Sequence, residues 1–322
     1  MCTAISFTTK KHYFGRNLDL HHRYDESVVI TPRRYPFLFS ATDRLVRHHS
    51  MIGIASVVDG YPLYYDAVNE FGLGVAGLNF PGNAIYSAPH PRKLNIASFE
   101  LIPFILSQCR TVTEVRVLLE NANITDAAFR GDLPVTPLHW MICDKTESVV
   151  LESVTDGLHL LNNPVGVLTN NPPFPYHLQN LTNYLNITSS EPMNRFCPSL
   201  TLEPYSFGMG GIGLPGDLSS VSRFVRAAFT KLNSCCGEDE ADSVAQFFHI
   251  MDSVAQVQGC VRLKDGMEKT VYSSCCNTDE GIYYYKSYSN NQITAVRLDR
   301  LGQEEKALSI YPLRWKQNIY YE

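Results

Sequence analysis

The sequence has no long uninterrupted apolar run and no surplus of basic charge. Its most apolar segment, Ser98 to Cys109, contains Glu100 and Pro103, whereas a helix that crosses a bilayer needs about 18 or more consecutive apolar residues. Lysine and arginine number 27 against 32 acidic residues, which gives a net charge of -5, and the basic residues form no stripe along the chain. These absences argue against a membrane protein and against a nucleic-acid partner.

A secretory leader and a regular cysteine pattern are missing as well. The first residues, Met-Cys-Thr-Ala-Ile-Ser-Phe, lack a basic stretch followed by a long apolar run, so we expect a cytoplasmic protein. Nine cysteines are scattered through the 322 residues, an odd number without the spacing of a disulfide framework. The sequence therefore predicts reduced thiols.

Metal-ligand spacing and a nucleotide-binding motif in the right context are also lacking. Adjacent pairs such as His21-His22 and Cys275-Cys276 do not have metal-ligand spacing. Neighbouring residues on a strand point to opposite faces, so such a pair cannot bind one metal ion together. The glycine-rich segment 208–213 fits the pattern Gly-x-Gly-x-x-Gly but precedes a proline instead of opening a helix. We therefore expect no metal and no cofactor.

The sequence does contain blocks of β-like residues. Runs of β-branched and aromatic residues predict a hairpin with arms at 3–9 and 12–19, which places Cys2 at the start of the first strand. The other predicted strands span 52–57, 63–68, 74–80, 138–143, 148–153, 158–161, 165–169, 269–274, 281–288 and 292–298.

Apolar residues at helical spacing lie between these blocks of strands. They predict helices at 99–109 and 113–121, and Thr111 with Glu114 forms a capping-box pattern before the second of them. The other predicted helices span 176–184, 220–232 and 242–254. Antiparallel strands that alternate with helix pairs favour an α+β fold in which two packed sheets carry helices on their outer faces. No repeat or linker divides the chain, so we expect one domain over residues 1–322.

Cys2 directly follows the initiator methionine, and its small side chain permits removal of that methionine. Removal of Met1 would give a single residue both a thiol and a free α-amine. Such an amine has an ordinary pKa of about 7.7 to 8.0, so a useful fraction is neutral near pH 7 and can accept a proton. Cys2 could then be nucleophile and base at once, although a cysteine at position two is by itself weak evidence for catalysis.

Two charged residues on the second arm of the predicted hairpin can assist Cys2. A thiol with a pKa of about 8.5 is only a few per cent ionised at pH 7, and a nearby cation raises that fraction. Arg16 can supply the cation, and Asp19 can hold the α-ammonium. The alternative is an exposed ion pair on a surface strand, which Gly15 and the flanking apolar residues disfavour.

A thiol that attacks a carbonyl carbon needs hydrogen-bond donors aimed at the oxyanion that develops there. Asn79 and Asn170 each stand where an apolar strand opens into a loop, so both are candidates for that task. Either could instead be an ordinary turn residue. Arg223 falls in the first turns of the predicted helix 220–232, where the alternative is a solvated helix face.

Five motifs, in this order, resemble those of the choloylglycine hydrolase family. They are Met-Cys-Thr-Ala at 1–4, Phe-Gly-Arg-Asn-Leu-Asp at 14–19, Ala-Gly-Leu-Asn-Phe at 76–80, Leu-Thr-Asn-Asn-Pro at 168–172 and Ser-Ser-Val-Ser-Arg-Phe-Val-Arg at 219–226. Further similar segments extend the resemblance over nearly the whole chain. It implies the four-layer αββα sandwich of N-terminal-nucleophile hydrolases, with two antiparallel sheets flanked by helices.

The resemblance also implies a catalytic set, a substrate and an assembly. The family's catalytic positions fall on Cys2, Arg16, Asp19, Asn79, Asn170 and Arg223. The implied reaction is hydrolysis of the amide bond between a bile acid and glycine or taurine through a Cys2 acyl-enzyme, with acyl transfer to amines as a side reaction. Removal of Met1 and a homotetramer are implied as well.

A pocket for the steroid is implied by the same resemblance. Its positions are apolar or aromatic here and fall on Leu18, Tyr24, Val58, Tyr65, Phe129, Leu133 and Leu138. Penicillin V acylases share the scaffold, but their best-known members carry tyrosine at the position of Asn79, so the asparagine favours the bile salt branch. Two alternatives stay open: a penicillin V acylase or other N-acyl amidase, and a non-catalytic bile acid binder that keeps Met1.

Overall fold

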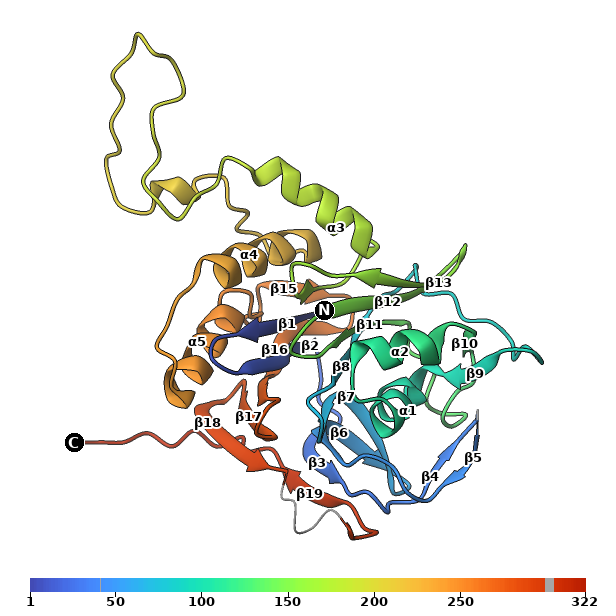
Figure 1. Ribbon diagram of the computed structural model, residues 1–322. Helices are drawn as coiled ribbons and strands as arrows, with labels where there is room; N and C mark the ends of the chain where they lie inside the picture. Colours follow the sequence, from blue (N-terminus) through green and yellow to red (C-terminus); the bar gives the residue numbers. More distant parts are fainter. Residues whose placement is uncertain (41, 299–303) are drawn as a thin grey trace.

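Two large antiparallel sheets form the centre of the structure, which a computed structural model describes for residues 1–40, 42–298 and 304–322 (Figure 1). The seven-stranded sheet has the order β14-β1-β2-β16-β17-β18, and β15 pairs with β16 at its side. Its strands are β1 (Cys2–Thr8), β2 (His12–Leu20), β14 (Val167–Leu168), β15 (Val261–Leu263), β16 (Gly266–Asn277), β17 (Ile282–Ser287) and β18 (Asn290–Arg297).

The second sheet has eight strands in the order β13-β12-β11-β8-β7-β6-β3-β19. They are β3 (Ser27–Thr31), β6 (Met51–Val58), β7 (Tyr61–Asn69), β8 (Gly74–Asn79), β11 (Leu138–Cys143), β12 (Ser148–Val154), β13 (Gly157–Asn162) and β19 (Ser309–Pro312). Two small sheets stand apart from it and pair β4 (Phe37–Phe39) with β5 (Thr42–Leu45) and β9 (Leu94–Ala97) with β10 (Ala122–Thr125).

Helices cover the outer face of each large sheet, which gives four layers (Figure 1). On the eight-stranded sheet lie α1 (Leu101–Gln108) and α2 (Val112–Leu119), and on the seven-stranded sheet lie α4 (Ser220–Asn233) and α5 (Glu240–Asp252). The short helices are η1 (Ser98–Glu100), α3 (Phe174–Asn180), η2 (Leu181–Tyr184) and η3 (Met209–Gly211). Within the described part of the chain, no helix has the length and apolarity to cross a membrane.

The β1–β2 hairpin lies inside the sandwich, so nearly all of its residues are buried instead of every second one. Its register sets Cys2 opposite Leu18 and Ala4 opposite Arg16. Gly15 allows β2 to lie close to β16, because a Cβ atom at this position would fall 2.1 Å from the carbonyl oxygen of Ser274. The hairpin register places the end of β2 beside the start of β1.

The α+β class and the layered arrangement expected from the sequence are confirmed. Thr111 caps α2 by accepting a hydrogen bond from the backbone N–H of Glu114, as the capping-box pattern predicts. Several boundaries differ: the expected helix 176–184 is α3 followed by the 3₁₀ helix η2, and the expected strand 165–169 has only the two residues of β14. The sequence patterns did not reveal β3, β4, β5, β9, β10, β15 and β19.

Candidate active site

Cys2 opens β1 in the interior of the protein, where its side chain is only 2 % exposed. Its backbone N–H donates a hydrogen bond of 2.8 Å to Oδ1 of Asn170, and its carbonyl oxygen accepts one of 2.5 Å from Nη1 of Arg223. Residues from three distant parts of the sequence therefore meet at the first residue of β1. Because Cys2 and Leu18 face each other across the hairpin, Arg16 and Asp19 lie nearby on β2.

Asn170 connects most of the candidate residues. Besides the Cys2 N–H, its Oδ1 accepts a hydrogen bond of 2.7 Å from Nη2 of Arg223, and its Nδ2 donates one of 2.7 Å to the carbonyl oxygen of Asn79. The backbone N–H of Asn170 donates to the hydroxyl of Ser220 at 2.8 Å, which ties the residue to the start of α4. These contacts fix the amide plane and leave one N–H of the side chain without a partner among them.

Arg223 is completely buried, which excludes the solvated helix face considered above. Ser219 caps α4 by accepting a hydrogen bond from the N–H of Ser222, so the first turn of the helix carries Arg223 toward β1. Its Nη1 also donates to the hydroxyl of Thr3 at 2.8 Å and lies 4.0 Å from the carboxylate of Asp19. Burial lowers the pKa of Arg223, and the negative charge of Asp19 opposes that shift.

Arg16 is also completely buried, but the partners of its Nη1 belong to the opposite sheet. Its Nη1 donates to the carbonyl oxygens of Tyr65 on β7 and Gly77 on β8, at 2.9 and 2.5 Å. Burial favours a lower pKa for Arg16, yet the surrounding anionic groups, Cys2 foremost among them, outweigh it and raise the pKa. The guanidinium is therefore a permanent cation whose charge interacts with that of the Cys2 thiolate.

Asp19 completes the charged groups around Cys2. Its Oδ1 accepts a hydrogen bond of 2.7 Å from the hydroxyl of Thr270, and its Oδ2 faces Arg223. Burial raises the pKa of Asp19, while Arg223 and the terminal ammonium pull that pKa back down. The carboxylate is thus held between a buried guanidinium and the chain terminus.

The terminal ammonium belongs to Met1, which precedes the nucleophile candidate. It donates a hydrogen bond of 2.8 Å to the carbonyl oxygen of Asp19 and forms an ion pair with the buried carboxylate of Glu268. Burial lowers the pKa of this ammonium, against the raising effect of Cys2 and Asp19. With Met1 in place the Cys2 nitrogen is an amide N–H, so this form of the chain has no free amine on Cys2.

Two of the residues expected to bind a steroid lie directly opposite catalytic candidates in the sheets. Leu18 and Leu138 are the register partners of Cys2 and Asn79, respectively. The hydroxyl of Tyr65 lies 2.9 Å from that of Ser56, and the Ser56 hydroxyl donates to the carbonyl oxygen of Tyr24 at 2.5 Å. The Tyr24 side chain is 49 % exposed. These contacts join Tyr24 and Tyr65 through Ser56.

Three other expected pocket residues lie around the hairpin between β6 and β7. Phe129 packs against the rings of Tyr61 and Phe99, with ring centroids 5.4 and 5.3 Å apart. Val58 is the register partner of Tyr61, and the backbone N–H of Leu133 donates to the carbonyl oxygen of Arg130 at 2.9 Å. An ion pair of 2.8 Å between Arg130 and Asp59 ties the segment that carries Phe129 and Leu133 to the hairpin.

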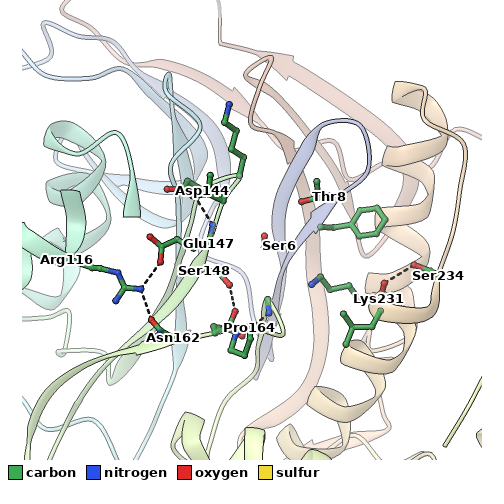
Figure 2. Close-up of a pocket in the computed structure, with 16 residues that line it drawn as sticks. Ser6, Thr8, Arg116, Asp144, Glu147, Ser148, Asn162, Pro164, Lys231 and Ser234 are labelled. Atoms are coloured by element: carbon green, nitrogen blue, oxygen red, sulfur yellow. Dashed lines mark hydrogen bonds and ion pairs between the residues drawn. The ribbon is translucent and has the colours of Figure 1, made fainter. Parts of the chain in front are cut away.

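A large cleft of about 940 Å³ lies elsewhere, at the other end of β1 (Figure 2). Ser6, Phe7 and Thr8 line one side of it, and at about 3.3 Å per residue Ser6 is roughly 13 Å from Cys2 along the strand. Lys231 and Glu147 are among the charged groups of its walls. This polar cleft contains none of the expected site residues.

Some residues that hold the site in place could not be recognised in the sequence. His139 on β11 contacts the carbonyl oxygen of Thr169 at 2.9 Å and the carboxylate of Glu152 at 3.0 Å, and Glu152 also accepts from the N–H of Phe174. The strand end that carries Asn170 is thereby anchored on both sides. The described part of the chain contains no group of three or more His, Cys, Asp and Glu side chains able to hold a metal ion.

Comparisons with known proteins show the family of the chain. The family model of linear amide C–N hydrolases, the choloylglycine hydrolase family, matches residues 2–310. The chain is 51 % identical to a bile salt hydrolase/transferase from Lactiplantibacillus plantarum over 321 residues, 99 % of each chain.

Solved structures give the same picture at the level of the fold. A crystal structure of a mutant conjugated bile acid hydrolase from Clostridium perfringens superposes with a TM-score of 0.91 at 33 % identity, over 100 % of this chain and 99 % of the other. A penicillin V acylase from Agrobacterium tumefaciens has a TM-score of 0.74 at 18 % identity, over 96 % and 90 % of the two chains. The second likeness concerns the fold alone.

Proposed function

The chain belongs to the choloylglycine hydrolase family of linear amide C–N hydrolases, and we propose that it cleaves the amide bond joining a bile acid to glycine or taurine. The products are the free bile acid and the amino acid. One observation carries the proposal: Cys2, at the start of β1, is joined by direct hydrogen bonds to Asn170 and Arg223, and Asn170 in turn to Asn79. The names of the relatives supply the substrate class.

In the proposed mechanism the Cys2 thiolate attacks the amide carbonyl once Met1 has been removed. Arg16 is a buried cation beside Cys2 and stabilises the thiolate. The α-ammonium of Cys2 protonates the departing amine, and the neutral amine then activates water that hydrolyses the thioester. Asp19 is suited to hold that ammonium, because its carbonyl oxygen already accepts a hydrogen bond from the Met1 ammonium next to it.

Asn79 and Asn170 are the proposed donors to the tetrahedral oxyanion. Asn170 keeps one side-chain N–H beyond its bond to the Asn79 carbonyl, and the backbone N–H of Asn79 is the second donor. Such donors are effective because they are fixed before the charge develops and need no rearrangement during the reaction. Arg223 orients Asn170 and the Cys2 carbonyl through its two terminal nitrogens and balances the charge of Asp19.

We assign the steroid to the apolar rim around Cys2 and Asn79. The residues assigned to this rim are Leu18, Tyr24, Val58, Tyr65, Phe129, Leu133 and Leu138. Their half-buried or exposed aromatic rings suit the flat apolar face of a sterol, and hydroxyls such as that of Tyr65 can meet its polar groups.

Comparison of three substrates tests the assignment. Glycocholate and taurocholate should be cleaved with a kcat/KM at least about 10-fold above that of phenoxymethylpenicillin, because the apolar rim matches a steroid better than a phenoxymethyl group. Release of glycine, taurine and 6-aminopenicillanic acid measures the three rates under one set of conditions. Faster cleavage of the penicillin would assign the chain to the acylase alternative instead.

An amine that replaces water at the second step would receive the same acyl group. The thioester carbon then forms a new amide bond, the Cys2 thiol leaves, and the amine loses a proton. Acyl transfer to amino acids is therefore part of the proposed activity, and the L. plantarum relative is named a hydrolase/transferase.

We further propose that the chain is one domain that assembles as a homotetramer in the cytoplasm. The segment between η2 and η3 projects from the body of the molecule (Figure 1), and it carries exposed apolar side chains such as Phe196 and Phe207, which are 82 % and 94 % exposed. Exposed apolar groups of this size favour a contact with another subunit. All nine cysteines are free, which fits a reducing compartment.

Light scattering on the purified enzyme tests the tetramer. It should give a mass of four times 36.2 kDa, and the mass of a monomer would refute the assembly.

A further inference from the structure

Asp66 is a buried carboxylate that the mechanism above does not use. It lies on β7 of the eight-stranded sheet and is only 1 % exposed, but its hydrogen-bond donors come from the seven-stranded sheet. The Tyr272 hydroxyl donates to Oδ1 at 2.7 Å, while the hydroxyls of Tyr283 and Ser274 donate to Oδ2 at 2.5 and 3.2 Å. One carboxylate thus joins the two sheets in the middle of the protein.

A β-bulge directs Asp66 into the space between the sheets. Asp66 pairs with Ile54 and Tyr64 pairs with Ala55, so Tyr65 is an extra residue in β7. Side chains on a regular strand alternate between faces, yet Tyr65 and Asp66 both contact the core between the sheets. The carbonyl oxygen of Tyr65 accepts a hydrogen bond from Arg16. The bulge therefore brings the Asp66 side chain and the Tyr65 carbonyl oxygen, which binds Arg16, into the same space between the sheets.

Asp66 is connected to Arg16 in two ways. The Ser274 hydroxyl accepts a hydrogen bond of 3.1 Å from the backbone N–H of Arg16 and donates to Asp66, so Ser274 bridges the two residues. The charges also interact: Asp66 helps to raise the pKa of Arg16. Burial raises the pKa of Asp66, and Arg16 opposes this shift more than any single one of the three hydroxyl donors does.

The guanidinium of Arg16 needs this counter-charge. A buried cation is costly unless an anion balances it, and the short-range partners of Arg16 are carbonyl oxygens, while its Nη2 has no hydrogen-bond partner. Asp19 is 4.0 Å from Arg223 and accepts from Thr270. Cys2 and Asp66 both raise the pKa of Arg16 more than Asp19 does, so the Cys2 thiolate and the Asp66 carboxylate are the main carboxylate and thiolate charges that balance the guanidinium.

The hydrogen bonds of Asp66 match those of an ionised carboxylate. Both of its oxygens accept from hydroxyl groups, three bonds in all. An ionised carboxylate only accepts hydrogen bonds, whereas a protonated one must also donate. The three donors and the guanidinium therefore favour the ionised form of Asp66, against burial, which raises its pKa overall.

We propose that Asp66 is a positioning residue that shares the Arg16 guanidinium with Cys2 and so sets the pH at which the Cys2 thiolate forms. It touches neither the thiol nor the substrate, and it acts through Arg16. This role rests on the proposed function of Cys2 as nucleophile. Because Asp66 is an anion near the same cation, its charge weakens the pull of Arg16 on the thiolate, while its hydrogen bonds keep β2 and β7 in place.

Other charged groups around these residues come from three elements. Asp19 on β2 and Arg223 on α4 face Cys2, together with the terminal ammonium. On the other side of Asp66 lies the buried thiol of Cys276 on β16, whose pKa is raised by burial first and by Asp66 second. Substitution at Asp66 leaves all of these groups in place, so a change in the pH dependence of Cys2 reports on the Asp66 charge.

The test is the pH dependence of Cys2 alkylation in the processed enzyme and in an Asp66→Asn variant. The rate of iodoacetamide labelling is followed on the N-terminal peptide by mass spectrometry, because eight other cysteines are present besides Cys2. Loss of the anion should move the midpoint of the labelling rate to lower pH by at least about 0.5 units. An unchanged midpoint, or a shift to higher pH, overturns the proposal.

A second pair of variants keeps the test decisive if Asp66→Asn does not fold. Tyr283→Phe removes one donor that lowers the pKa of Asp66. Its loss favours the neutral form of Asp66, so the midpoint should shift in the same direction by a smaller amount. The neighbouring Tyr284 donates its hydroxyl to Glu240 at 2.9 Å and provides the matched control, so Tyr284→Phe should leave the midpoint unchanged. Equal shifts in both variants, or none in Tyr283→Phe, contradict the role of Asp66. Since labelling involves no bile acid, the outcome is independent of whether the substrate assignment is right.

Discussion

Replacement of Cys2 by serine is expected to abolish both hydrolysis of conjugated bile acids and transfer of the bile acid to amines. Both reactions pass through the same acyl-enzyme in the proposed mechanism, and a serine hydroxyl is far less acidic than a thiol and forms almost no alkoxide at neutral pH. Loss of a nucleophile lowers kcat by about 10⁴-fold or more in comparable enzymes. Chromatography of the products from glycocholate, with and without added phenylalanine, measures both activities.

The substitution is small, so the protein should fold as before. A matched control is Cys109→Ser, because Cys109 is another buried thiol, 3 % exposed, and belongs to the core around α1. This control should keep nearly full kcat/KM, and the unfolding temperatures of both variants report any structural loss. Parent-like activity in Cys2→Ser would remove Cys2 from the mechanism, and equal losses in both variants would point to damaged packing instead.

Retention of Met1 is expected to inactivate the enzyme although every side chain of the site is present. In this form the Cys2 nitrogen is an amide whose N–H donates to Asn170, so it cannot accept a proton. Loss of a general acid–base group lowers the rate by about 10²- to 10⁴-fold. The chain can be produced behind a cleavable extension, so that protease treatment yields either Cys2 or Met1 as the first residue.

The two cleavage products differ only in Met1 and serve as each other's controls. The product that begins with Cys2 should recover full activity, and the product that begins with Met1 should stay inactive while binding taurocholate, as isothermal calorimetry can measure. The structure accommodates Met1 through its contacts with Asp19 and Glu268, so the extra residue does not disturb the fold. Full activity with Met1 in place would show that the free amine is dispensable.

Much of the site could be predicted because its residues lie in short contiguous motifs. Cys2, Arg16 and Asp19 belong to one hairpin, and its predicted arms already place the end of the second strand opposite the start of the first. Asn79 ends β8 as expected, and Arg223 lies in the first turn of α4, where the serine cap sets the start of the helix. Local signals were sufficient wherever the position depended on one element.

Other features depend on contacts between distant segments and leave no local trace. Glu268, which holds the Met1 ammonium, and Thr270, which binds Asp19, lie on β16 and reach the site through pairing of β16 with β2. Asp66 would be expected on the surface from its residue type, but the bulge at Tyr65 directs it into the core. The edge strand β19 is recognisable only from its pairing with β3, near the start of the chain.

The acyl-enzyme itself provides the most direct test of the proposed function. The processed protein is mixed with glycocholate or taurocholate, quenched in acid within milliseconds to seconds, and digested, and the N-terminal peptide is weighed by mass spectrometry. We expect the same cholyl thioester on Cys2 from both substrates, because the amino acid has already departed when the thioester forms. An adduct on a different residue, an adduct that still contains glycine or taurine, or turnover without any adduct on Cys2 at any time point would contradict the proposed mechanism.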